Sequence, residues 1–273
     1  MTRFGDCFIL IFAQLAVGGT VALAVPPFRL MERGFFKSSA GIFLGFALVF
    51  LAAKVNLIVR GGTFSLRIGF EVALWTAFCS VLGVYLASLW GDDYVRRARA
   101  FALSLILGLA AIVVTADAYR PVPLDGVLGL LYTLPVLTGT LAMGGVATGM
   151  LLGHWYLIDL GLSIDPLQRL LRFFLVATAV HLAVLLLVPA LYAITSPYGA
   201  AAVRSLLIDH RPLLVTRLGL GPIAALLIGY LIHRTLLIPQ TMAATGLFYI
   251  AILFVMVGEM LSRLILFRTS LAL

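Results

Sequence analysis

From Thr241 to Leu266 the chain reads TMAATGLFYIAILFVMVGEMLSRLIL, and this stretch decides the fold class. It is longer than the roughly 20 mainly apolar residues that a membrane-spanning helix needs. One acid, Glu259, interrupts it, and a carboxylate inside a span costs on the order of 3 kcal/mol unless it faces protein or water. Arg263 lies on the same helical face, one turn further on. Two interpretations are open: a structural ion pair, or a proton- or quinol-handling carboxylate in a polar pocket.

The composition extends this conclusion to the whole chain. Of its 273 residues, 63% are hydrophobic and 11% are charged, which is far less polar surface than a soluble domain of this length carries. The alternating pattern of a membrane barrel is absent, so the spans are predicted to be helices. The net charge of +8 is spread over short loops. It therefore indicates anchoring at the membrane interface and not nucleic-acid binding.

Residues 1–273 are predicted to form one all-α membrane domain, a bundle of eight transmembrane helices. The predicted spans are residues 6–25, 39–59, 68–90, 100–118, 124–157, 167–194, 213–233 and 241–266. An even number of spans puts both termini on the same side, which we call side A; the opposite side is side B. Arginine and lysine are divided almost equally between the loops of the two sides, so the positive-inside rule does not orient the protein.

Several polar residues within the spans are predicted to lie at similar depth, near the side A boundary. They are Lys54, Asn56, Glu71, Asp117, Arg120, Arg217, Glu259 and Arg263. Because so many ionisable groups are costly against lipid, we predict a polar pocket that opens toward side A. The expected pairs are Lys54 with Glu71, and Arg217 with Glu259 or Asp117. The alternative is a set of snorkelling side chains and structural ion pairs, which needs no cavity.

Small residues recur at helical spacing in two of the predicted spans. They are Gly144, Gly145, Gly149 and Gly153 in the fifth span and Gly18 and Gly19 in the first. Small residues four positions apart let helices approach closely in lipid, where packing drives their association. Close helix packing is therefore the favoured interpretation, with a slot for an isoprenoid tail as the weaker one.

The sequence contains no metal-binding motif. Cys7 and Cys79 are isolated, without CxxC or CxxCH, so no metal of the chain's own is predicted. His154 and His233 both fall at side B ends of their spans and are the pair whose depths match for a b-type haem. Their arginine and aromatic neighbours favour interfacial roles, so haem is not expected there. His181 lies near mid-membrane with no predicted partner at its depth.

Short motifs in four spans share their order and spacing with a known group of membrane anchors. They are Phe12-x-Gln14-x-x-x-Gly18-Gly19, then Thr133, Thr140, Met143-Gly144-Gly145 and Gly149, then Arg217, and finally Gly258-Glu259-x-x-x-Arg263. Together with the eight spans, this order resembles the membrane anchor subunit of dimethyl sulfoxide reductase (the DmsC type) and the wider group of NrfD-like anchors. The resemblance covers nearly the whole chain.

The resemblance implies a subunit of the bacterial cytoplasmic (inner) membrane that takes part in anaerobic respiration. It would take electrons from menaquinol or ubiquinol and pass them to an iron–sulfur subunit, which feeds a molybdopterin catalytic subunit. The quinol site would lie near the docking partner, and side A is the expected side. The residues predicted for this site are Glu259 and Glu71 as proton acceptors and Gln14, Lys54, Asn56, Arg217 and Arg263 as quinol contacts. A structural anchor or assembly subunit without a redox site, and a small-solute transporter, are the alternatives.

The chain departs from the family pattern at two positions. Asn56 stands where the family has a histidine linked to quinol chemistry, and an amide cannot take a proton as imidazole does near neutral pH. Thr76 stands where the family has an acid, and Glu71 lies more than one turn earlier. The quinol site is therefore either rebuilt around Lys54, Glu71 and Glu259, or lost.

Overall fold

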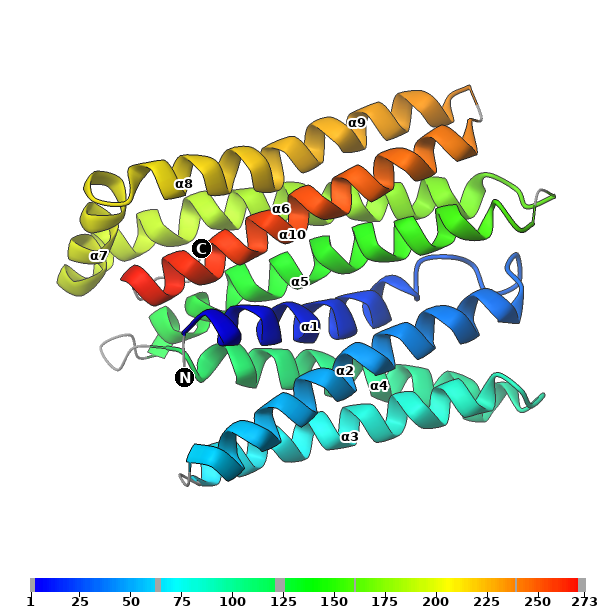
Figure 1. Cartoon of the computed structure of the whole chain (residues 1–273), viewed down its shortest axis with the longest axis horizontal. Coiled ribbons are helices and arrows are strands. Elements are labelled where there is room, and N and C mark those ends of the chain that lie inside the picture. The colour runs from blue at the N-terminus through cyan, green and yellow to red at the C-terminus, as the bar shows by residue number, and fades with distance from the viewer. Residues whose placement is uncertain (1–2, 62–64, 121–125, 160, 239, 270–273) are drawn as a thin grey trace.

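The computed structural model describes residues 3–61, 65–120, 126–159, 161–238 and 240–269, and every regular element in these ranges is a helix (Figure 1). The elements are α1 Arg3–Ala22, α2 Arg33–Gly61, α3 Leu66–Ser88, α4 Tyr94–Asp117, α5 Gly126–Trp155, α6 Asp165–Thr195, α7 Pro197–Ile208, α8 Arg211–Leu218, the π-helical turn η1 Gly219–Ile223, α9 Ala224–Leu236 and α10 Thr241–Thr269. The prediction of an all-α protein is confirmed.

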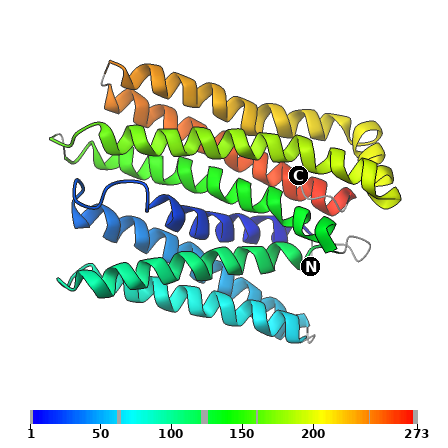
Figure 2. The same ribbon diagram turned by 180° about the vertical axis from the view of Figure 1, so that it is seen from behind.

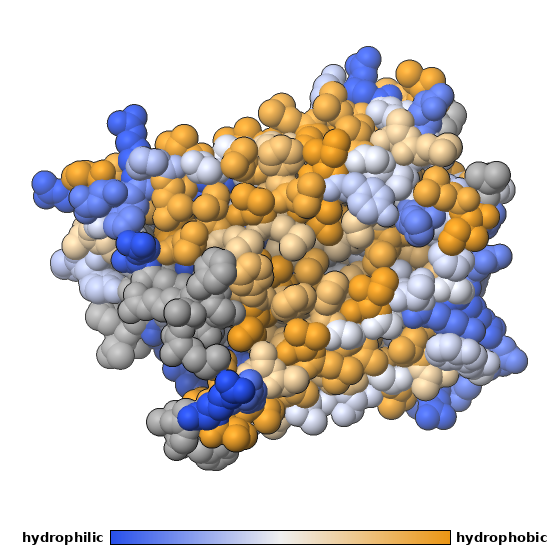
Figure 3. Space-filling model, viewed as in Figure 1, coloured by the Kyte–Doolittle hydropathy of each residue, from blue (hydrophilic) through white to orange (hydrophobic). Residues whose placement is uncertain are grey.

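Seven stretches of the described residues are long and apolar enough to cross a membrane. They are Arg33–Arg60, Leu66–Ser88, Tyr94–Asp117, Gly129–Trp155, Asp165–Thr195, Arg211–Leu236 and Thr241–Leu266. The apolar part of α1, Phe8–Ala22, is shorter. Apolar residues form the middle of the molecule and hydrophilic ones gather at its two ends (Figure 3). The protein is therefore an integral membrane protein, as its composition predicted.

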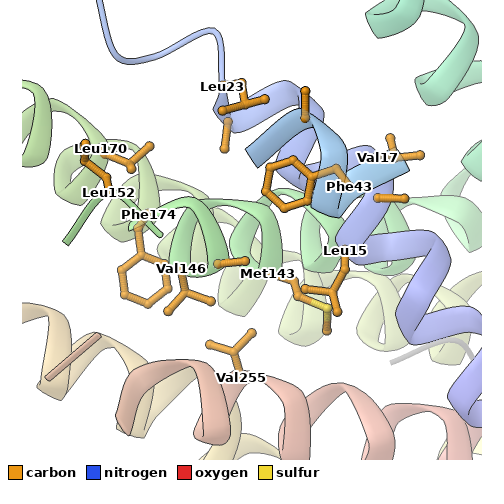
Figure 4. Packing of buried hydrophobic residues seen from close by; sticks show 14 of the residues in the cluster. Leu15, Val17, Leu23, Phe43, Met143, Val146, Leu152, Leu170, Phe174 and Val255 are labelled. Atoms are coloured by element: carbon orange, nitrogen blue, oxygen red, sulfur yellow. The ribbon is translucent and has the colours of Figure 1, made fainter. Parts of the chain in front are cut away.

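Helices α1 and α5 form the centre of the bundle. Helices α2, α3 and α4 lie on one side of this central pair, and α6, α8, α9 and α10 lie on the other (Figures 1 and 2). Figure 4 shows Leu15 of α1 close to Met143 of α5, and Val255 of α10 close to Val146 of α5. Helix α1 begins and α10 ends at the same end of the bundle, where α7 also lies (Figure 1). We keep the name side A for this end.

The predicted close packing of small residues is confirmed where α1 meets α5. A Cβ atom on Gly18 would lie 1.9 Å from the backbone oxygen of Thr140, and one on Gly144 would lie 2.0 Å from the backbone of Gly18. Real atoms do not approach this closely, so the two backbones touch only because both residues are glycine. Gly149 likewise accommodates the Phe248 ring of α10, since a Cβ atom there would lie 2.4 Å from it.

Gly144→Ala is expected to destabilise the folded protein by about 2 kcal/mol or more, because overpacking costs about 1–3 kcal/mol even where side chains can move. Here the neighbour is backbone. Thermal unfolding of the detergent-solubilised protein measures the effect. Gly45→Ala is the matched control, since a Cβ atom on Gly45 meets nothing within 4 Å. Equal unfolding temperatures for the two variants would contradict the close α1–α5 contact.

The seventh predicted span, residues 213–233, differs from a single regular helix. It consists of α8, η1 and α9, and Gly221 has non-helical backbone angles (φ −78°, ψ −105°). Pro222 follows, and a proline inside a helix removes a hydrogen bond and clashes with the preceding turn.

The helix α7 was not predicted. A new helix begins after α6 because the Ser196 side chain accepts a hydrogen bond from the Gly199 amide, and this bond caps the first turn of α7.

Candidate functional site

Glu259 lies at the centre of a buried polar cluster between the helices, with 2% of its surface exposed. Its Oε1 accepts a hydrogen bond from Arg217 Nη2 at 2.8 Å. Its Oε2 accepts from Gln14 Nε2 at 2.8 Å and from Arg263 Nη2 at 3.0 Å. The carboxylate therefore joins α1, α8 and α10. The predicted pairing of Glu259 with Arg217 is confirmed, and so is that with Arg263.

His181 of α6 completes this group. Its Nε2 lies 2.8 Å from Arg217 Nη2 and 3.2 Å from Glu259 Oε1, and its Nδ1 lies 2.8 Å from Thr138 Oγ1. The Thr138 hydroxyl also lies 2.8 Å from the Leu134 carbonyl oxygen, to which it can donate. The Nε2 atom faces both Arg217 and Glu259, so the imidazole links these two charged side chains to Thr138. We call these six residues the Glu259 cluster: Gln14, Thr138, His181, Arg217, Glu259 and Arg263.

Three glycines make room for the charged groups. A Cβ atom on Gly139 of α5 would lie 2.8 Å from both carboxylate oxygens of Glu259. A Cβ atom on Gly258 would lie 2.6 Å from the Cα of Gly221 and 2.9 Å from Arg217 Nη1. The break in the seventh span therefore brings η1 against α10 and leaves space for the Arg217 guanidinium between them.

The Glu259 cluster lies deeper than predicted. Glu259 is ten residues before the end of α10 and Gln14 is eleven residues after the start of α1, so each lies about 15 Å from the side A end at about 1.5 Å per residue. The adjoining cavity, lined by Thr178, His181 and Glu259 among others, measures about 10 Å³. This is at most the room of a water molecule and not of a quinone ring. Around Glu259, the described residues therefore form a closed ion-pair cluster and not the pocket that the sequence predicted.

The cluster holds two guanidinium groups against one carboxylate. Gln14 Oε1, Arg217 Nε and Arg263 Nε have no hydrogen-bond partner among the described residues. Buried ions are tolerated only when they are well paired, because each loses its hydration on burial. The short contacts to Glu259 are what make two buried arginines acceptable inside lipid-spanning helices.

A second polar cluster occupies the side A part of α2, α3 and α4. Lys54 Nζ lies 2.9 Å and 3.1 Å from the two carboxylate oxygens of Glu71, which is 3% exposed. Thr115 Oγ1 donates to Glu71 Oε1 at 2.8 Å and accepts from Trp75 Nε1 at 2.9 Å. The predicted Lys54–Glu71 pair is confirmed. The Lys54 side chain is 16% exposed, so this pair, which we call the Lys54–Glu71 cluster, reaches the protein surface.

The two clusters do not share one pocket. The Lys54–Glu71 cluster lies between α2, α3 and α4, whereas Glu259 and its charged partners lie across the central pair α1 and α5, on α6, α8 and α10 (Figure 1). Similar depth along the helices therefore did not bring all the ionisable residues together. The prediction of a single polar pocket containing Glu71 and Glu259 is wrong for the described residues.

Other predicted residues lie outside both clusters. Asn56 is exposed on α2, and Thr76 is exposed on α3, where it donates to the Val72 carbonyl. Asp117 pairs with Arg67 and with Arg120, the latter at 2.7 Å, and not with Arg217 as the alternative pairing predicted.

His154 and His233 are both exposed at helix ends. Within the ranges that the structure describes, no group of three or more His, Cys, Asp or Glu side chains is arranged to hold a metal ion.

Two members of the Glu259 cluster were missed by sequence reasoning. His181 was considered only as a haem ligand, and Thr138 was not considered. A signal was available, since His181 lies in the middle of an otherwise apolar part of α6, and an imidazole inside a span needs a partner. Which helix supplies that partner is a matter of lateral packing, and the sequence pattern does not contain it.

The chain matches no protein-family model, no curated protein and no solved structure at a significant level. The functional argument therefore depends on the two clusters and on the resemblance carried by the motifs.

Proposed function

We propose that this chain is the quinone-interacting membrane anchor of a multi-subunit oxidoreductase, of the kind represented by the DmsC-type and NrfD-like anchors. It crosses the bacterial cytoplasmic membrane eight times, with both termini on the same side. Helix α1 serves as the additional span, which is supported by its packing along α2 and α5 inside the bundle. The observation that carries the proposal is the Lys54–Glu71 cluster, a buried acid–base pair that reaches the surface within apolar helices.

The quinol head group binds at the exposed edge of Lys54. The rings of Phe50 and Tyr119 lie 5.7 Å and 5.8 Å from Lys54 Nζ, and flat aromatic rings suit a quinol ring. Oxidation of quinol to quinone releases two electrons and two protons. The Glu71 carboxylate accepts one proton and the other leaves to side A water. The electrons pass to an iron–sulfur subunit docked at side A, which feeds a molybdopterin subunit.

Exposed arginines beside this site suit an acidic partner. Arg60 lies in the last turn of α2 and Arg67 in the first turn of α3, and both are exposed at side A. Complementary charge of this kind steers docking and fixes orientation more than it adds affinity. The iron–sulfur centre of the partner would then lie near the Lys54–Glu71 cluster, because electron transfer from the quinol requires a short distance.

We assign the Glu259 cluster a structural role in this proposal. Its carboxylate contacts arginines of two helices and a glutamine of a third, and the adjoining space is too small for a quinol. Glu259, predicted from sequence as a proton acceptor, instead holds α1, α8 and α10 together. Glu71 remains the proton acceptor.

Isolation in mild detergent tests the proposal. We expect an iron–sulfur protein and a molybdopterin protein to co-purify with the chain, and the complex to bind a short-chain quinone in a fluorescence or calorimetric titration. Purification of the chain alone, with no quinone binding in either the isolated or the membrane-embedded form, would leave a structural or assembly role.

A small-solute transporter is the second candidate, because one observation favours it. Discontinuous helices often form the mid-membrane binding site of transporters, and the break at Gly221 adjoins the buried Arg217. The adjoining cavity of about 10 Å³ restricts any occupant to the size of water or a single small ion. Solute uptake by vesicles containing the purified chain would favour this candidate over the quinone anchor.

A further inference from the structure

A cavity of about 230 Å³ lies at the side B end of the bundle, opposite the Lys54–Glu71 cluster. It is lined by the loop that follows α1, by α2 and α3, and by the first turns of α4. Five of its eleven lining residues are aromatic, and one of the eleven is charged, an arginine. We call it the Arg97 pocket, after the residue that lines it with Leu23, Phe28, Phe36, Tyr85 and Phe101.

Arg97 is a buried cation without an acid. It is 6% exposed, and no carboxylate of a described residue forms an ion pair with it. Its Nη2 donates to the Gly91 carbonyl at 2.9 Å and its guanidinium lies 5.0 Å from the centre of the Phe28 ring. Its Nε–H has no partner among the described residues. An arginine always carries its charge, so the described residues leave this guanidinium without a counter-charge and its Nε–H without an acceptor.

The backbone around Arg97 also favours an anion. Tyr94, Arg97 and Ala98 lie in the first turns of α4, and the amino end of a helix carries partial positive charge. Asp93, one turn before Arg97 in the chain, is exposed and accepts from the Arg96 amide at 2.9 Å as the helix cap. Asp92 is paired with Arg33 at 3.0 Å. Neither acid neutralises the guanidinium of Arg97.

The position of the pocket identifies the source of the anion. Residues 89–93 connect the apolar spans Leu66–Ser88 and Tyr94–Asp117 beside the pocket. The pocket therefore lies at the level of the lipid head groups. Trp90 and Tyr94 are exposed beside it, and such aromatic residues mark the membrane interface. Lys37, over the Trp90 ring at 4.4 Å, and the exposed Arg96 and Arg99 add positive charge.

We propose that the Arg97 pocket binds the phosphate group of an anionic phospholipid. The phosphate supplies the missing negative charge beside the Arg97 guanidinium, and the aromatic walls contact the glycerol and the first methylenes of the acyl chains. Basic pockets between membrane helices are known to hold anionic head groups. A neutral quinone carbonyl would satisfy the donor but not the charge. This proposal is independent of the quinone site on side A.

Thermal unfolding of the full chain in detergent, with phosphatidylglycerol or phosphatidylcholine added, tests the proposal. At about a hundredfold excess over Kd, a single bound phosphatidylglycerol should raise the unfolding midpoint by about 5 °C more than phosphatidylcholine does. Arg97→Gln should bind phosphatidylglycerol about tenfold more weakly, because it loses a charge-assisted hydrogen bond. Arg169→Gln removes an exposed arginine from the side B part of α6, away from the pocket, and should keep the wild-type response.

Three outcomes would overturn the proposal. One is an equal loss of the phosphatidylglycerol response in both variants, which would mean general surface attraction. Another is full protection by inorganic phosphate alone, which would make the ligand a free anion. The third is protection by a short-chain quinone and not by phosphatidylglycerol.

If Arg97→Gln does not fold, Arg97→Lys keeps the charge, and native mass spectrometry of its retained lipid replaces the unfolding measurement. Arg97→Lys should then retain phosphatidylglycerol in preference to phosphatidylcholine, and equal retention of the two lipids would contradict the phosphate site.

Discussion

Glu71→Gln should slow quinol oxidation by the intact complex by about a hundredfold, the lower range of what a positioned proton acceptor contributes. The amide cannot accept the quinol proton, and it leaves the Lys54 ammonium, 2.9 Å away in the wild-type protein, without its counter-charge. The rate is measured with a short-chain quinol as donor and the complex's own iron–sulfur centre as the spectroscopic acceptor, so no knowledge of the terminal substrate is needed.

Two further variants separate proton transfer from folding. Glu71→Asp keeps an acid at a shorter reach and should recover part of the rate. Glu32→Gln removes an exposed acid from the side B loop before α2 and should leave the rate unchanged. A Glu71→Gln complex that assembles and oxidises quinol at the wild-type rate would show that the Lys54–Glu71 cluster is not the quinol site.

Glu259→Gln should cost about 3–5 kcal/mol of folding free energy, the range found when one partner of a buried ion pair is removed. The substitution leaves Arg217 and Arg263, each about 1% exposed, without the carboxylate that both contact. Denaturant unfolding in mild detergent, followed by the loss of helical signal, measures the change. Asp92→Asn removes an exposed acid from a surface pair with Arg33 and serves as the control, with little expected effect.

The structural assignment of Glu259 can fail in a specific way. If Glu259→Gln retains wild-type stability and loses quinol oxidation, then Glu259 is the proton acceptor and the closed cluster opens during turnover. A double-mutant cycle with Arg217→Met adds a second measure. For residues in direct contact the two substitutions should couple by about 0.5–3 kcal/mol, whereas independent residues would show simple additivity.

Depth along the helices was predictable from sequence because hydropathy and short loops determine it. Lys54 lies seven residues before the end of α2, and Glu71 lies five residues after the start of α3. Two helices joined by a short loop are antiparallel neighbours, so residues at equal distances from the loop meet. The Lys54–Glu71 pair was predicted from the similar depth of the two residues, and the short loop between their helices is why they meet. The Glu259–Arg217 pair was also expected, although its depth was underestimated.

Lateral position was not predictable in the same way. Hydropathy indicates where a helix enters and leaves the bilayer, but it does not indicate which helices are neighbours around the bundle. Glu71 and Glu259 were therefore placed in one pocket, whereas the structure puts them on opposite sides of α1 and α5. His181 as a partner of Arg217, and Thr138 as a partner of His181, were missed for the same reason.

The amino-acid sequence by itself determined that the chain is a helical membrane protein. A chain with so much apolar surface is stable only in lipid, and helices satisfy their own backbone hydrogen bonds there. It also determined that acids inside the spans need basic partners. Only the tertiary structure decided which partners they have, which acid is enclosed and which reaches the surface. Those outcomes depend on close backbone contacts, such as Gly18 with Gly144 and Gly221 with Gly258, that bring distant parts of the chain together.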